Sequence, residues 1–257
     1  MIRHEIYKLV KSKAFWIVVA LTFIFPIAMS FLMVSVVGGD GKVQGMPVDL
    51  NASTALLDAC ANAQIWSILA MVVISSLVVG DYNNGIVRNM VMSGMPRWKV
   101  WFVKLGLSVI LTVVAFGIFV LVESIIMGAW YGRGSVAVGR YFGTLCVAAL
   151  LSIALSSVIL FLADLTRNTG ATLGITILLF IAFSIFTMCV HMIPASNEAL
   201  RKTFEIIGEL FVGNVLSSAA SFTWTAAKMW QYVATSVATF AVCTGLGFWL
   251  FCRRDLK

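Results

Sequence analysis

The sequence predicts an all-α membrane protein that crosses the bilayer six times. Of its 257 residues, 61% are hydrophobic and 11% are charged, whereas soluble domains have about 45–50% apolar and about 25% charged residues. The chain also contains six apolar stretches, each close to the roughly 17–25 residues that a transmembrane helix needs. We therefore expect one transmembrane domain over residues 1–257, without a second domain or a strong internal repeat.

The six spans are predicted from the limits of the apolar stretches. They are Ala14–Val37, Ala63–Val79, Trp101–Ala129, Tyr141–Ala163, Gly170–Ile193 and Met229–Cys252. The first is too long for the apolar core of a signal peptide, and no A-x-A cleavage site follows it. We interpret it as a permanent span that Pro26 can kink. The helix-prone segment Ser53–Asn62 should extend the second span outward.

A basic segment precedes the first span. In Ile2–Lys13 the apolar side chains Ile2, Ile6, Leu9 and Val10 share one helical face, and Lys8 and Lys11 point away from it. Such a basic amphipathic helix is expected to lie along the anionic inner membrane surface. The alternative is a flexible basic lead-in that only fixes topology.

Lysine and arginine set the expected orientation, because cytoplasmic loops carry an excess of both. About twelve fall on the side that holds both chain termini and the loop between the second and third spans, against about six on the other side. The N- and C-termini should therefore be cytoplasmic, as an even number of spans requires. The net charge of +7 reflects this topology, and we expect no nucleic-acid partner because no basic stripe is interleaved with aromatic residues.

The longest outer connection, residues 194–228, contains a second amphipathic pattern. Its apolar positions recur at helical spacing: Leu200, Phe204, Ile207 and Phe211. We expect a helix on or in the outer leaflet. The apolar segment Val212–Ser221 is too short to span and fits a re-entrant turn.

Small residues recur four positions apart in two of the spans. The fifth has Gly170 and Gly174, and the fourth has Ser152 and Ser156. Such pairs permit close helix approach, within the chain or between protomers.

No catalytic motif is present. The sequence lacks a phosphate-binding G-x-x-x-x-G-K-[ST] loop, H-E-x-x-H and G-x-S-x-G. The five cysteines form no close-spaced set among themselves. His191 lies near Cys189, Met188 and Met192, a group that could suggest a soft-metal site, and we interpret it as the outer end of a packed helix. We therefore expect no catalytic residue, metal or cofactor in this chain, and no nucleotide hydrolysis by it alone.

Glu123 is the one charged residue well inside a predicted span. Intramembrane carboxylates are functional candidates. However, Lys104 marks the inner end of that helix, and nineteen residues correspond to roughly 28 Å. Glu123 is thus a candidate polar site near the outer interface, where it can snorkel or pair with Arg133 or Arg140. The scarcity of buried charge argues against an ion-coupled carrier.

The segment Gly80–Val100 interrupts the apolar pattern between the second and third spans. Asn83–Asn84–Gly85 is turn chemistry, Ile86–Met92 predicts a short helix, and Ser93–Gly94 ends it because glycine adopts the left-handed cap. Pro96 can open the next helix, with Trp98 and Trp101 anchoring the interface. Ordinary connections need about 2–8 residues, so we predict a structured docking surface.

This segment, GDYNNGIVRNMVMSGMPRWKVWFVK, resembles the cytoplasmic segment of ABC-2 type transporter permeases. The matching residues are Asp81, Tyr82, Gly85, Arg88, Ser93, Gly94, Arg97 and Lys104, although many family members have glutamate at the position of Asp81. The resemblance extends to the six spans, the basic N-terminal helix and the long outer connection before the sixth span.

The resemblance implies a half-transporter of an ABC exporter in a bacterial plasma membrane. A second permease chain, identical or similar, would complete the pore, and two ATP-binding subunits would supply ATP and Mg²⁺. Residues Asp81, Tyr82, Gly85, Arg88, Asn89, Ser93, Gly94 and Arg97 would couple this chain to the ATPases. The implied cargo is hydrophobic or amphipathic: a peptide such as a bacteriocin, a drug or a lipid. A secondary carrier or channel and a non-transporting membrane anchor remain alternatives.

Overall fold

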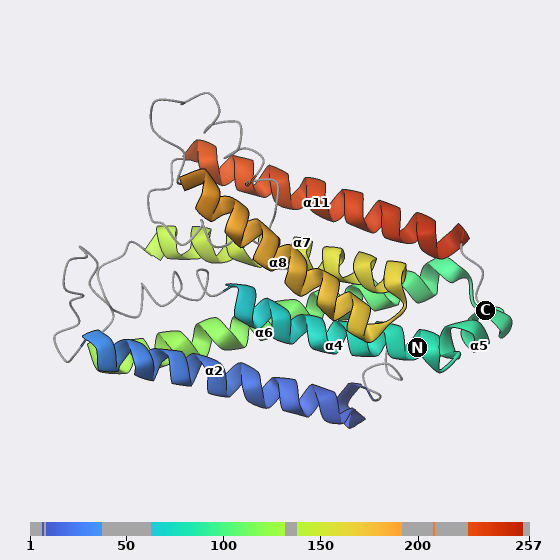
Figure 1. Ribbon diagram of the computed structural model, residues 1–257, viewed down its shortest axis with the longest axis horizontal. Coiled ribbons are helices and arrows are strands. Elements are labelled where there is room, and N and C mark those ends of the chain that lie inside the picture. Colours follow the sequence, from blue (N-terminus) through green and yellow to red (C-terminus); the bar gives the residue numbers. More distant parts are fainter. Residues whose placement is uncertain are drawn as a thin grey trace.

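The computed structural model describes residues 9–37, 63–131, 138–191 and 226–253, together with Tyr7 and Gly208. The regular elements in these ranges are helices, and the described residues contain no strand. The helices are α2 (Lys13–Val37), α4 (Ala63–Asn83), α5 (Ile86–Met92), α6 (Arg97–Tyr131), α7 (Val138–Thr166), α8 (Thr169–His191) and α11 (Ala226–Arg253). Figure 1 shows the long helices running side by side, with α5 at one end of the bundle.

The long helices coincide with the predicted spans. Five of them are long and apolar enough to cross a membrane, and the bent pair of α4 and α5 makes a sixth candidate. With 21 residues, α4 is about 32 Å long, sufficient by itself for a hydrocarbon core of about 30 Å. We therefore regard α4 as the span and α5 as a separate short helix.

Helix α7 occupies the middle of the bundle. It contacts α4, α6, α8 and α11, and 61% of its apolar stretch is buried, against 11–33% for α2, α6, α8 and α11. Small residues line its buried faces, including Ala148, Ser152 and Ser156. The last two hydroxyls donate to carbonyls of their own helix at 2.7 Å. The predicted small-residue pair of this span thus lies where close helix packing occurs.

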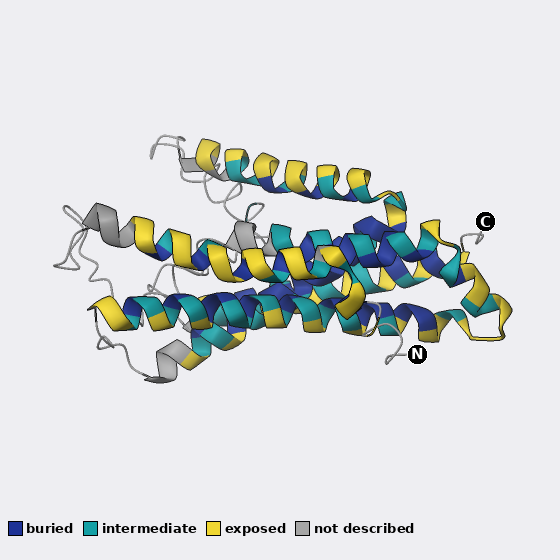
Figure 2. Ribbon diagram, turned by 90° about the horizontal axis from the view of Figure 1, so that it is seen from below, coloured by how far each residue is buried: buried dark blue, intermediate teal, exposed yellow. Residues whose placement is uncertain are grey.

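The outer helices present apolar side chains to their surroundings. Figure 2 shows exposed residues along the outward faces of the helices and buried ones between them. Exposed positions include Ile125 on α6, Leu178 on α8 and Trp230 on α11. In water this surface would be costly, whereas lipid tails solvate it without cost.

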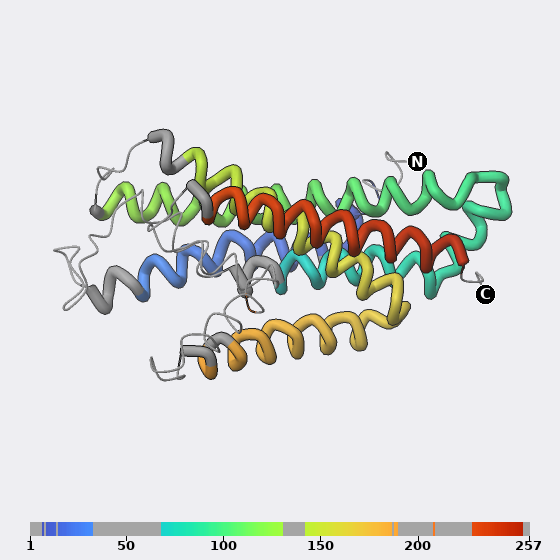
Figure 3. The backbone as a smooth tube through the Cα atoms, turned by 90° about the horizontal axis from the view of Figure 1, so that it is seen from above, coloured from blue at the N-terminus to red at the C-terminus, as the bar shows by residue number. Residues whose placement is uncertain are grey.

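Helix α8 lies at one edge of the bundle, as Figure 3 shows. Its Gly170 and Gly174 are exposed. No atom lies within 4 Å of the position that a Cβ would take at Gly174, and only the Asn168 side chain approaches that of Gly170. This glycine pair therefore makes no close helix contact within the described chain.

The N-terminal segment is helical at Tyr7 and at 9–11, and breaks at Ser12 before α2 begins. Leu9 is buried and Lys11 is exposed, as the amphipathic pattern predicts, but Val10 is exposed rather than buried. Leu9 and Val18 pack against Val73 and Leu77 of α4 in a satellite cluster. The expected helix ahead of the second span and the outer segment 194–228 lie almost entirely outside the described residues.

Candidate functional site

The connection between α4 and α6 forms two turns around the seven-residue helix α5. The axis of α5 is bent by 59° from that of α4. Gly85 begins α5 with a φ of 65°, a left-handed conformation that glycine adopts without a Cβ penalty. The bend thus depends on the Asn-Gly turn that the sequence predicts at this position.

The end of α5 is closed by a Schellman motif. Gly94 has a φ of 90°, its N–H donates to the carbonyl of Val91, and the N–H of Met95 donates to the carbonyl of Met90. Helix α6 begins at Arg97, directly after Pro96. The predicted order of turn, short helix, glycine cap and proline is therefore confirmed.

Helix α5 has one buried face and one exposed face. Val87 is buried in the main core, whereas Arg88 and Asn89 are exposed. Met92 and Met95, beyond them, are 68% and 39% exposed. An arginine beside solvent-facing methionines is a composition typical of protein interfaces.

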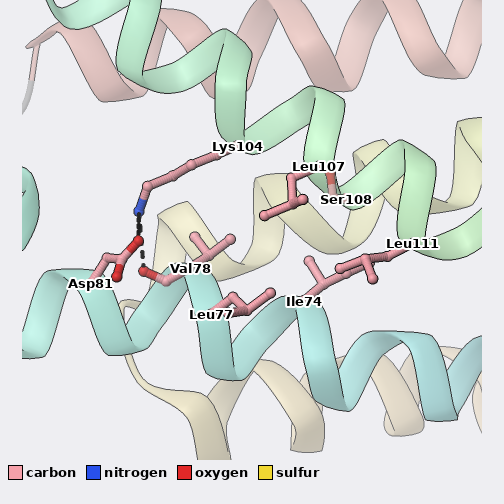
Figure 4. Close-up of a pocket in the computed structure, with 8 residues that line it drawn as sticks. All are labelled: Ile74, Leu77, Val78, Asp81, Lys104, Leu107, Ser108 and Leu111. Atoms are coloured by element: carbon pink, nitrogen blue, oxygen red, sulfur yellow. Dashed lines mark hydrogen bonds and ion pairs between the residues drawn. The ribbon is translucent and has the colours of Figure 1, made fainter. Parts of the chain in front are cut away.

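An ion pair joins α4 to α6 close to the turn that leads into α5. Lys104 Nζ of α6 is 3.1 Å from Asp81 Oδ2 of α4, and the two side chains are 5% and 2% exposed. The ammonium also donates to the Val78 carbonyl at 3.5 Å and lies 5.0 Å from the centroid of the Tyr82 ring. Figure 4 shows the pair bridging the two helices beside apolar side chains that include Leu77 and Leu107.

A second carboxylate, Asp164 near the end of α7, joins the same corner. The Tyr82 hydroxyl donates to its Oδ1 at 2.7 Å, and the indole N–H of Trp101 donates to its Oδ2 at 3.0 Å. Asp164 is 3% exposed. Its two oxygens therefore tie one residue of α4 and one of α6 to the central helix.

Arg167 supplies the second cation of this cluster. Its guanidinium lies 5.0 Å from the centroid of the Tyr82 ring, and it acts electrostatically on Asp164, as does Lys104. Its backbone has a φ of 48°, a left-handed conformation that costs a residue with a Cβ about 1–2 kcal/mol. Two cations thus lie over the Tyr82 ring, and the hydroxyl of the same residue donates to Asp164. We call Asp81, Tyr82, Trp101, Lys104, Asp164 and Arg167 the charged corner.

A further hydrogen bond connects α6 to the last helix. Arg97 Nη1 donates to the carbonyl of Cys252 at 2.8 Å. The end of α11 therefore lies at the same end of the bundle as α5 (Figure 1). The charged corner and this bond together fasten the ends of α4, α6, α7 and α11 to one another.

The predicted coupling residues fall into two groups. Asp81 and Tyr82 point into the bundle and form contacts within the chain, and Arg97 is half-buried. Arg88, Asn89, Ser93 and Gly94 are exposed, and Gly85, which precedes α5, is half-buried. The second group is thus accessible at the surface, whereas the first group forms contacts within the chain.

Three residues of the charged corner differ from the sequence expectation. Trp101 is 1% exposed and bonds a carboxylate, so it is not an interface anchor, whereas Trp98 is exposed as predicted. Asp164 carried no predicted role; the predicted fourth span ends at Ala163, whereas α7 continues to Thr166. Arg167 carried no predicted role. The sequence feature that could have indicated these two residues is an acidic and a basic side chain three positions apart at the inner end of the fourth span.

Glu123 is also buried, with 2% of its surface exposed. It is held within the protein rather than snorkelling toward the interface. The side chains of Arg133 and Arg140 lie outside the described set, so the predicted pairing stays a prediction.

The charged corner is a buried polar network that connects several helices. Its polar groups bond one another and link helices far apart in sequence, and no group of three potential metal ligands occurs among the described residues. Buried networks of this kind rigidify the elements that they connect. The network therefore ties the ends of α4, α6 and α7 to one another beside α5.

Comparison with known proteins gives one family. The model of a family described as ABC-2 family transporter protein matches residues 61–250 of the chain. No curated protein matches the chain at a significant level.

Proposed function

The chain belongs to the ABC-2 family of transporter proteins, and from this premise we propose that it is the permease subunit of an ATP-driven exporter in a bacterial plasma membrane. Members of this family are membrane components of transporters, and the apolar helices of this chain indicate a multi-pass membrane protein. The observation that carries the proposal is the exposed face of α5, where Arg88 and Asn89 lie beside the exposed Met92 and Met95.

ATP hydrolysis would take place in partner chains. The sequence has no phosphate-binding loop, so two separate ATP-binding subunits would bind ATP and Mg²⁺ and dock on α5. This end of the bundle would then face the cytoplasm, together with both termini. A second permease chain, identical or similar, would complete the transporter.

Coupling would work by rigid-body movement. Closure of the ATPase subunits would displace α5, and the charged corner would carry that displacement to α4, α6 and α7. Only contacts that differ between the two states can drive such a change. A short helix held between two turns, with Val87 buried in the main core, suits this role because it would move together with the spans.

The coupling residues would then have two roles. Arg88, Asn89, Ser93 and Gly94 would contact the ATPase, with Gly85 setting the bend. Asp81, Tyr82 and Arg97 would position the helix ends through bonds within the chain.

The cargo would be hydrophobic or amphipathic, and peptides including bacteriocins, drugs and lipids all satisfy that description. The resemblance and the apolar helices support this class. A polar solute would need hydrogen-bonding groups along its path.

The proposal is tested by co-purification of the chain with its ATP-binding subunit. Arg88→Glu should weaken the complex by about 2 kcal/mol or more, which is about 30-fold in Kd, because a buried interfacial arginine is replaced by a carboxylate. ATPase activity stimulated by the permease should fall in parallel, while membrane insertion stays unchanged.

Lys228→Glu is the matched control. It makes the same change of charge at an exposed residue of α11, and twenty-four residues separate it from Cys252, or about 36 Å of helix. The affinity of this variant for the ATP-binding subunit should equal that of the unmodified chain. Unchanged co-purification and transport in Arg88→Glu, or transport by the chain alone driven by an ion gradient, would overturn the proposal.

A further inference from the structure

An apolar groove of about 1110 Å³ lies between the N-terminal segment, α2, α4 and α6. Its volume slightly exceeds the range of about 300–1,000 Å³ that is common for small-ligand sites. The groove is separate from the charged corner, and its walls are almost entirely hydrocarbon.

One wall is a stripe of α6. Trp98, Phe102, Gly106, Ile110 and Val114 line the groove and follow one another at intervals of four residues, so they form one ridge that is inclined to the helix axis. From the first to the last of them is about 24 Å along the helix, a length comparable to most of the hydrocarbon core. Trp98, Phe102, Ile110 and Val114 are each half or more exposed.

Gly106 sits in the middle of the stripe. It is exposed, and no atom lies within 4 Å of the position that its Cβ would take. A larger side chain there would project into the groove rather than into a neighbouring helix.

One end of the groove is basic and aromatic. Lys99 lines it, and its ammonium lies 5.4 Å from the centroid of the Trp98 ring. Trp16 of α2 lines it as well, with its indole N–H donating to the Val10 carbonyl at 2.7 Å. Lys11 and Lys13, both exposed, flank this wall in the sequence.

We propose that this groove is a binding site for one anionic phospholipid. Its acyl chains lie along the α6 stripe, and its phosphate is paired with the Lys99 ammonium. A long apolar channel with cationic groups at one end complements an amphipathic anion, and tryptophans at that end suit the headgroup level. The inference does not depend on the ATPase partner or on the cargo.

The site would also secure the N-terminal segment. Leu9 and Val10 line the groove from one side and α6 from the other. A lipid between them would hold the N-terminal segment, α2 and α6 as one surface.

The test is native mass spectrometry of the purified full chain in micelles with equimolar phosphatidylglycerol and phosphatidylcholine. The unmodified chain should retain one phosphatidylglycerol in preference to phosphatidylcholine. Lys99→Gln should reduce that preference about fivefold, which corresponds to about 1 kcal/mol. Gly106→Leu should lower retention of both lipids because it fills the channel.

Two controls separate this site from ordinary surface lipid. Gly245→Leu places the same side chain at an exposed glycine of α11 that also has no neighbour within 4 Å, and Lys228→Gln removes an exposed lysine elsewhere. Both should retain the lipid as the unmodified chain does. Equal retention of the two lipids, no effect of Lys99→Gln, or an equal loss in the control variants would overturn the proposal.

Discussion

Removing one partner of the Asp81–Lys104 pair should destabilise the protein more than removing both. Each charge is almost fully buried, and the two atoms are 3.1 Å apart. Lys104→Met or Asp81→Leu leaves a buried charge without its counterion, which costs about 3–5 kcal/mol. The double variant replaces the pair by apolar groups of similar volume, which is often close to neutral.

A second contribution sets the stability of the double variant. Lys104 also lies over the Tyr82 ring, and a cation–π contact is worth about 0.5–2 kcal/mol. That contact is lost in both variants that lack Lys104. The double variant should therefore lie about 1–2 kcal/mol below the unmodified protein, and above either single variant.

The measurement is unfolding in mixed detergent micelles, with the free energy of unfolding obtained for all four forms of the cycle. Lys228→Met, which removes an exposed lysine, is the control and should stay within about 0.5 kcal/mol of the unmodified protein. The reasoning is refuted if the double variant is no more stable than the more stable single variant, or if both single variants lose under 1 kcal/mol, because the buried charges would then not depend on each other.

Two glycine substitutions give further predictions. Gly85→Ala should lower the free energy of unfolding by about 1–2 kcal/mol through its left-handed φ alone, since no atom lies near its Cβ position. Gly85→Asn should lower it less because asparagine tolerates that conformation. Equal losses of stability in thermal unfolding would contradict this. Gly247→Ala should cost about 1–3 kcal/mol, because its Cβ would lie 3.2 Å from the Trp101 ring, which a hydrogen bond holds in place. Gly245→Ala, with open space in the same helix, should instead be neutral or slightly stabilising, and a shared loss would point to helix α11 rather than to the ring contact.

The sequence alone was sufficient for the helices and for the α5 turn. Long apolar stretches specify spans because every backbone group in lipid must be bonded within its own helix, so the helix limits follow the composition closely. The turn, short helix and glycine cap between Asn83 and Pro96 could be predicted from the sequence equally well. Its glycines and proline fix the backbone locally, without reference to distant residues.

Only the tertiary structure decided which polar residues meet. Asp81 and Lys104 are twenty-three positions apart, and Asp164 is sixty-three beyond Trp101, so their contact depends on how α4, α6 and α7 pack. In such an apolar chain nearly every helix face is equally hydrophobic, so the pattern of hydrophobic residues does not show which face packs against the other helices. The sequence therefore determined where the described helices and the α5 surface lie, and packing determined that a buried charged corner joins α4, α6 and α7 at the end of the bundle where α5 lies.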